Sequence, residues 1–126
     1  MLGWEVIVYK QTDGGSSPAK SESERGNSIA AWLTDMNGLN WLEALVKTGK
    51  AIDLGGNGYP MTFTTTAEDL IPQLVQGPPQ ALKTFHLCEA LSALANRNSE
   101  ATVTALVQSA GCRMGEWLLI HAWDQS

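Results

Sequence analysis

Residues 116–123 read Glu116-Trp117-Leu118-Leu119-Ile120-His121-Ala122-Trp123, a run with almost no polar face. A strand with one side in water alternates apolar and polar residues, whereas a strand covered on both sides does not. The run therefore predicts an interior β-strand. The other strongly apolar strand pattern is WEVIVYK at residues 4–10, which is rich in β-branched and aromatic residues. We expect these two terminal strands to lie side by side at the centre of a sheet.

The composition changes abruptly after the first strand. Residues 11–27 consist largely of Gly, Ser, Lys, Glu and Pro, and such a stretch has too few apolar residues to form a packed element. Unstructured loops of this length are uncommon unless they are functional or disordered. We therefore predict an exposed, flexible loop from Gln11 to Asn27.

Apolar residues recur at helical spacing in five later segments. The expected helices begin at Ser28, at Asn40, at Thr65 or Thr66, at Gln80 and at Ser99. The first should end near Asn37. The strongest should run from Gln80 to about Asn96, and the last should end at Gly111. Ser, Thr and Asn are favoured N-cap residues because their side chains accept hydrogen bonds from the first free N–H groups.

A hairpin is expected between the second and third helices. Residues 50–54 and 59–64 have strand character, and the turn between them is Gly55-Gly56-Asn57-Gly58, which tolerates positive φ. A phosphate-binding loop would instead need a Lys followed by Ser or Thr at the start of a helix. The run continues into Tyr59-Pro60, so the hairpin interpretation is favoured.

The expected element order is β-α-α-β-β-α-α-α-β without repeats. This order predicts an α+β fold with a small, mostly antiparallel sheet of about four strands and helices packed on one face. The terminal strands are expected at the centre. Residues 1–126 fit one domain, because 44% of the residues are hydrophobic and 17% are charged.

Charge and the absence of targeting patterns narrow the classes of function. The formal net charge of −5 disfavours nucleic-acid binding and favours encounter with a basic partner. The start of the chain lacks the basic region and apolar run of a signal peptide, and no apolar stretch approaches the length of a membrane helix. We therefore expect a cytoplasmic protein that binds neither membranes nor nucleic acids.

The sequence gives little support for catalysis or metal binding. Cys88 and Cys112 lack the spacing of a zinc or redox motif and are expected as free thiols. His86 and Glu89 share a predicted helix face, but no further metal ligands accompany them. We expect no catalytic residues, no metal and no cofactor, and the sequence favours a protein that is not an enzyme.

Five tryptophans beside two Phe and two Tyr are the most distinctive feature of the composition. Trp often anchors protein interfaces, although burial in the core is the alternative for each one. We expect a small acidic protein-binding protein, most concretely an inhibitor of the immunity or antitoxin type that covers a partner protein. The candidate contact residues are Trp32, Asp35, Trp41, Asp53, Asn57 and Tyr59.

Two alternatives remain open. The first is a small enzyme or ligand-binding domain with a pocket between the sheet and the helices, for which residues 11–27 would act as a lid. The second is a homo-oligomeric structural subunit, for example a homodimer, that associates through the edge of its sheet.

Overall fold

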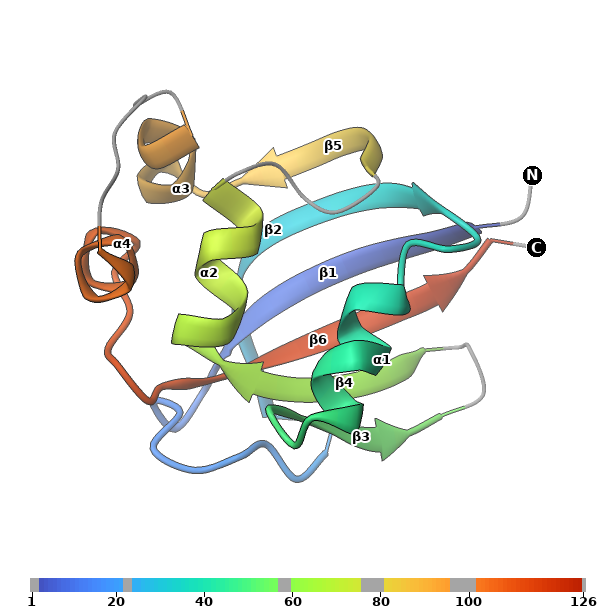
Figure 1. The fold of residues 1–126 in the computed structure, drawn as a ribbon, viewed down its shortest axis with the longest axis horizontal. Coiled ribbons are helices and arrows are strands. Elements are labelled where there is room, and N and C mark those ends of the chain that lie inside the picture. Colours follow the sequence, from blue (N-terminus) through green and yellow to red (C-terminus); the bar gives the residue numbers. More distant parts are fainter. Residues whose placement is uncertain (1–2, 22–23, 57–59, 76–80, 96–101, 126) are drawn as a thin grey trace.

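Six strands and four helices make up the part of the chain that the computed structural model describes, residues 3–21, 24–56, 60–75, 81–95 and 102–125. The strands form one antiparallel sheet in the order β3-β4-β6-β1-β2-β5 (Figure 1). The elements are β1 (Gly3–Gln11), β2 (Arg25–Asp35), α1 (Asn40–Lys47), β3 (Ala51–Gly55), β4 (Met61–Thr66), α2 (Ala67–Val75), β5 (Ala81–Leu87), α3 (Glu89–Ala95), α4 (Val103–Ser109) and β6 (Trp117–Asp124). The predicted α+β class is confirmed, although the sheet has six strands where about four were expected.

The two terminal strands form the central pair of the sheet. β6 lies between β1 and β4, and Val6 and Val8 pair with Ala122 and Ile120. Every side chain from residue 118 to residue 122 is at most 1% exposed. The prediction of an interior C-terminal strand beside the N-terminal strand is therefore confirmed.

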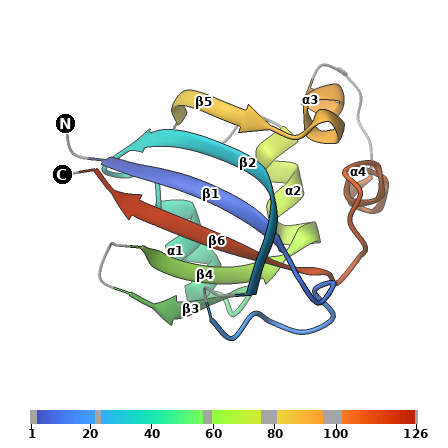
Figure 2. The same cartoon turned by 180° about the vertical axis from the view of Figure 1, so that it is seen from behind.

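The helices cover one face of the sheet. α1 and α2 lie across that face, and α3 and α4 pack beside α2 (Figure 1). The core fills the space between them with Val6, Val8 and Ile120 from the sheet and with Leu42, Leu70, Ile71 and Leu74 from the helices. Figure 2 shows the opposite face of the sheet, over which no described helix lies.

The helix expected from Ser28 to Asn37 is wrong, because this segment is strand β2. The spacing of Ile29, Trp32 and Met36 suits a helix, but a second pattern with a period of two runs through the same residues. Ala30, Trp32 and Thr34 alternate along the strand and are all fully buried. Pairing with β1 satisfies the backbone of the segment and selects the strand.

The long helix expected from Gln80 to Asn96 is also wrong in its first half. Residues 81–87 form the edge strand β5, and α3 begins at Glu89. Leu82 and Phe85 fall at helical spacing in the sequence, yet they are 54% and 50% exposed. The register with β2 shifts at both residues, so each is the extra residue of a β-bulge.

Residues 11–27 do not form a detached loop. Gln11 ends β1, and β2 begins at Arg25. Between them the carbonyl of Gly15 accepts a hydrogen bond from the Trp117 N–H at 2.8 Å, and the Ala19 N–H donates to Thr64 Oγ1 at 3.3 Å. Ala19 is 3% exposed. The expectation of an exposed loop is therefore wrong at Gln11 and Ala19, which are 5% and 3% exposed, whereas the flexibility of the loop stays a prediction.

The expected helix caps are only partly correct. α1 begins at Asn40 as expected, but its N-cap is Leu39, which makes no side-chain cap hydrogen bond. The cap of α4 is Thr102, whose hydroxyl accepts from the Ala105 N–H at 3.2 Å. The expected cap Ser99 lies outside the described residues.

The predicted hairpin is confirmed as β3 and β4, in which Ala51 pairs with Thr65 and Asp53 pairs with Phe63. Its outer member, β3, is an edge strand, and β4 joins the hairpin to β6. The contact residues Asn57 and Tyr59, expected at the hairpin tip, lie outside the described residues.

Candidate functional site

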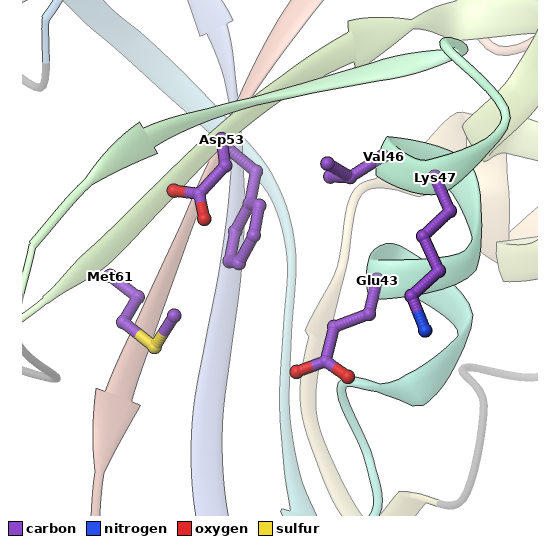
Figure 3. A pocket seen from close by; sticks show the side chains of 6 residues that line it. Glu43, Val46, Lys47, Asp53 and Met61 are labelled. Atoms are coloured by element: carbon purple, nitrogen blue, oxygen red, sulfur yellow. The ribbon is translucent and has the colours of Figure 1, made fainter.

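A pocket of about 210 Å³ opens between α1 and the β3–β4 hairpin (Figure 3). Three of its lining residues come from α1 and three from the hairpin: Glu43, Val46, Lys47, Asp53, Met61 and Phe63. We call this site the α1–hairpin pocket.

Local geometry explains why these side chains converge. Glu43, Val46 and Lys47 are three and four residues apart, so they share one face of α1. Asp53 pairs with Phe63 across the hairpin, and paired residues lie on the same face of a sheet. The fully buried Leu42 fixes α1 against the sheet.

The pocket combines an apolar floor with a charged rim. Phe63 is 1% exposed and Val46 and Met61 are half-buried, whereas the side chains of Glu43, Lys47 and Asp53 are exposed. Asp53 Oδ1 accepts a hydrogen bond from the Gly55 N–H at 2.8 Å. Among the described residues, neither the Glu43 carboxylate nor the Lys47 ammonium has a hydrogen-bond or ion-pair partner. The rim therefore keeps its charges available to a ligand.

Of the six contact residues expected from the sequence, Asp53 lines this pocket. Trp32 is fully buried, and its ring centroid lies 6.5 Å from that of the half-buried Trp41. Trp32 therefore offers no surface to a partner, and its expected contact role is corrected to core packing. Asp35 lies at the end of β2, where Oδ1 accepts from the Asn37 N–H at 2.8 Å. The structure does not bring it into the pocket.

Glu43 and Lys47 were not singled out by the sequence reasoning. Their spacing of four residues on a short helix that precedes a strand with an aspartate was the available signal. Nothing in the sequence alone showed that this face of α1 would lie opposite Asp53.

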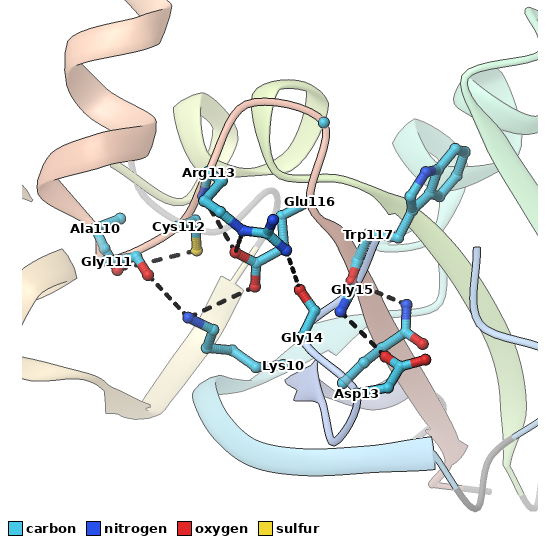
Figure 4. A network of polar contacts seen from close by, with 12 residues as sticks. Lys10, Asp13, Gly14, Gly15, Ala110, Gly111, Cys112, Arg113, Glu116 and Trp117 are labelled. Carbon is cyan, nitrogen blue, oxygen red and sulfur yellow. Dashed lines mark hydrogen bonds and ion pairs between the residues drawn. The ribbon is translucent and has the colours of Figure 1, made fainter. Parts of the chain in front are cut away.

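A second polar cluster surrounds Glu116 at the start of β6 (Figure 4). Its carboxylate is 3% exposed and lies 3.5 Å from Lys10 Nζ and 3.8 Å from Arg113 Nε. The Arg113 N–H donates to Glu116 Oε1 at 3.1 Å, and Arg113 Nη2 donates to the carbonyl of Gly14 at 2.5 Å. A buried carboxylate needs such partners to offset its desolvation. The cluster thus ties β1, the Gly14 turn and β6 together, which is a structural role.

Cys112 lies beside this cluster and is not an activated nucleophile. Burial first, and the nearby Glu116 carboxylate second, raise the pKa of its thiol from 9.0 to about 11 against the opposing effect of Lys10. The thiolate is the reactive form of cysteine, so this thiol is inert at neutral pH. Cys88 and Cys112 are both free, as the sequence predicted.

The raised pKa of Cys112 has a consequence for stability at alkaline pH. The protonated thiol favours the folded state fully below pH 9, where both states are protonated, and this contribution is lost as the pH rises from 9 towards 11. We expect Cys112→Ala to flatten the fall in the free energy of unfolding over that range. Urea denaturation of wild type, Cys112→Ala and the control Cys88→Ala at several pH values measures it. Equal slopes for wild type and Cys112→Ala would contradict the assignment.

No group of three or more His, Cys, Asp or Glu side chains within the described ranges is arranged to hold a metal ion. None of the helices in that part of the chain has the length and hydrophobicity of a membrane span. No protein-family model, curated protein or solved structure matches the chain.

Proposed function

We propose that this protein binds a partner protein by accepting an arginine or lysine side chain in the α1–hairpin pocket. One observation carries the proposal: the carboxylates of Glu43 and Asp53 stand on the rim of a pocket whose floor is apolar and includes Phe63. A long basic side chain has the matching form, because it buries an apolar stem and presents a charged end. An inhibitor of the immunity or antitoxin type is the function that this binding mode serves best.

The size of the pocket favours a side chain over a metabolite. Sites for small molecules have volumes of roughly 300–1,000 Å³, whereas this pocket has about 210 Å³. The overall charge supports the same class of partner. A net charge of −5 accelerates encounter with a basic protein and slows encounter with acidic ones.

Lys47 contributes selectivity at the rim. Its ammonium lies on the same helix face as Glu43, one turn further along. This ammonium is not paired with Glu43 in the structure, so the carboxylate is free to accept a basic guest. A neutral guest forms no ion pair with Glu43 or Asp53, so the rim discriminates between basic and neutral guests.

A defined probe tests the recognition step. We expect the amide resonances of Val46, Asp53 and Phe63 to shift when acetyl-arginine amide is titrated into the labelled protein. The neutral isostere acetyl-citrulline amide should cause no comparable shift. Glu43→Gln and Asp53→Asn should each weaken arginine binding by about fivefold, the order expected of a partly exposed ion pair. Glu89→Gln is the matched control, because Glu89 is an exposed carboxylate on α3, away from the pocket (Figure 1).

A capture experiment tests the inhibitor function. The tagged protein should retain a basic protein from its native host, and the double variant Glu43→Gln/Asp53→Asn should lose that protein while Glu89→Gln keeps it. Equal arginine and citrulline responses would overturn the pocket assignment. A charge-selective response to arginine without any captured protein would overturn the inhibitor function and leave the pocket chemistry standing.

A further inference from the structure

The two carboxylates of the α1–hairpin pocket come from different walls. Glu43 belongs to α1 and Asp53 belongs to β3, and both side chains point towards the space between these elements (Figure 3). Asp53 Oδ1 already accepts a hydrogen bond from the Gly55 N–H at 2.8 Å, which leaves Oδ2 as the better acceptor for a guest. A cation that pairs with both carboxylates must therefore donate in two directions at once.

The geometry of the donors separates the two basic side chains. A guanidinium is planar and carries five N–H donors at separate corners, so it can donate to Glu43 on one side and to Asp53 on the other. An ammonium carries its three donors on a single nitrogen. It pairs with both carboxylates only if this one atom lies within hydrogen-bond distance of both walls.

The apolar floor of the pocket favours the guanidinium as well. Phe63 is 1% exposed, Val46 and Met61 are half-buried, and none of these side chains offers a strong hydrogen-bond acceptor to a guest. A charged group that lies over this floor loses part of its hydration. The loss is small for a guanidinium, which is weakly hydrated and stacks on aromatic rings, and large for the strongly hydrated ammonium.

Lys47 shows how an ammonium behaves beside these carboxylates. It follows Glu43 by four residues on α1, a spacing at which Glu and Lys can form an ion pair. Within the described part of the chain, however, Lys47 Nζ makes no ion pair or hydrogen bond with Glu43 or Asp53. The Lys47 side chain is exposed and extends on the side of Glu43 away from Asp53 (Figure 3). An ammonium that the chain itself holds next to the pocket thus stays in water.

We propose that the α1–hairpin pocket selects arginine over lysine. This inference rests on the proposed function, because it specifies which basic side chain of the partner protein the pocket accepts. The guanidinium lies over the apolar floor and donates to Glu43 from one edge and to Asp53 Oδ2 from the other. Dimethylation of that arginine prevents binding, because it keeps the charge but blocks the donors of one edge.

Three basic probes test the selectivity. In titrations followed by NMR, acetyl-arginine amide should bind at least about tenfold more tightly than Nα-acetyl-lysine amide, which keeps its ε-ammonium. The asymmetrically dimethylated arginine probe should bind no better than the lysine probe. Glu43→Gln and Asp53→Asn should each reduce the ratio of arginine to lysine affinity to about two, because either cation can pair with a single carboxylate.

The outcomes separate this inference from the proposed function. Equal affinities for the arginine and lysine probes, both above that of acetyl-citrulline amide, would overturn the selectivity and leave a pocket for basic side chains. A response to both basic probes that does not exceed the citrulline response would overturn the proposed function itself.

A guanidinium attached to the chain gives a second test. Lys47→Arg should fill the pocket from within the protein and weaken the binding of acetyl-arginine amide by at least about fivefold. Lys83→Arg is the matched control and should leave the affinity unchanged, because Lys83 lies on β5, at the opposite edge of the sheet from β3. Circular dichroism confirms that both variants are folded. Unchanged arginine affinity in Lys47→Arg would contradict a preference for the guanidinium over the ammonium.

Discussion

A chain that ends at Gly115 is expected to lose cooperative folding altogether. β6 is hydrogen-bonded to β1 on one side and to β4 on the other, so its removal divides the sheet into two separate parts. It also exposes Val6, Val8 and Phe63, which are at most 1% exposed in the intact protein. Thermal melting followed by circular dichroism should show no transition for the fragment. A soluble fragment that melts cooperatively would show that β6 is peripheral.

A point substitution measures the same dependence quantitatively. Ile120→Ala should lower the free energy of unfolding by about 2–5 kcal/mol, because it leaves a cavity at a fully buried position of the central strand. Ile52→Ala is the control, since Ile52 is 40% exposed on the edge strand β3 and should lose less than about 1 kcal/mol. Urea denaturation gives both values. Similar losses for the two variants would contradict the central role of β6.

Trp32→Ala should lower the free energy of unfolding by about 3–5 kcal/mol. Trp32 is fully buried and is the largest side chain of the core, so its removal leaves a large cavity. Its indole N–H has no hydrogen-bond partner among the described residues, so Trp32→Phe loses volume but no hydrogen bond and should be much milder. Urea denaturation followed by circular dichroism compares the variants.

Trp32→Phe also distinguishes a role of Trp32 in core packing from a role in ligand binding. At low temperature the folded fraction of Trp32→Phe should bind acetyl-arginine amide as wild type does, because Trp32 does not line the pocket. A loss below about 1 kcal/mol for Trp32→Ala would instead indicate that the side chain is replaceable and not part of the core.

Segments with a single periodicity were predictable from the sequence. The run at residues 116–123 is apolar at every position but its first and sixth, and only an interior strand accommodates that pattern. α1 has one apolar stripe around Leu42 and ends at Lys47, and Gly49 follows its C-cap with a φ of +79° that suits this position. The run Gly55-Gly56-Asn57-Gly58 indicated the turn of the hairpin. In these places local and tertiary preferences agree.

Segments with two periodicities were not predictable. Residues 28–36 fit a helix through Ile29 and Trp32 and fit a strand through Ala30, Trp32 and Thr34. The choice depends on a free edge of β1, which is information from distant residues. In β5 the two bulges disturb the alternation that would have marked a strand, so Leu82 and Phe85 fall at helical spacing.

The candidate site was predictable at one residue. Asp53 was expected from its charge, and the structure puts it on the rim of the pocket. Glu43 and Lys47 depend on how α1 docks on the hairpin, which the pattern of α1 does not encode. Trp32 was misjudged because amino-acid type alone does not distinguish an interface anchor from a core residue.

The central pairing of β1 with β6 also governs when the protein can fold during translation. β1 pairs with β2, which follows it directly, and with β6, which is separated from it by every other described element. Closing this contact joins nearly the whole chain into one loop, which gives a high contact order and slow folding. Until then β1 presents an unpaired apolar edge, which is a template for aggregation. The apolar edge of β1 is therefore the part of the sheet most open to wrong pairing until β6 has been synthesised.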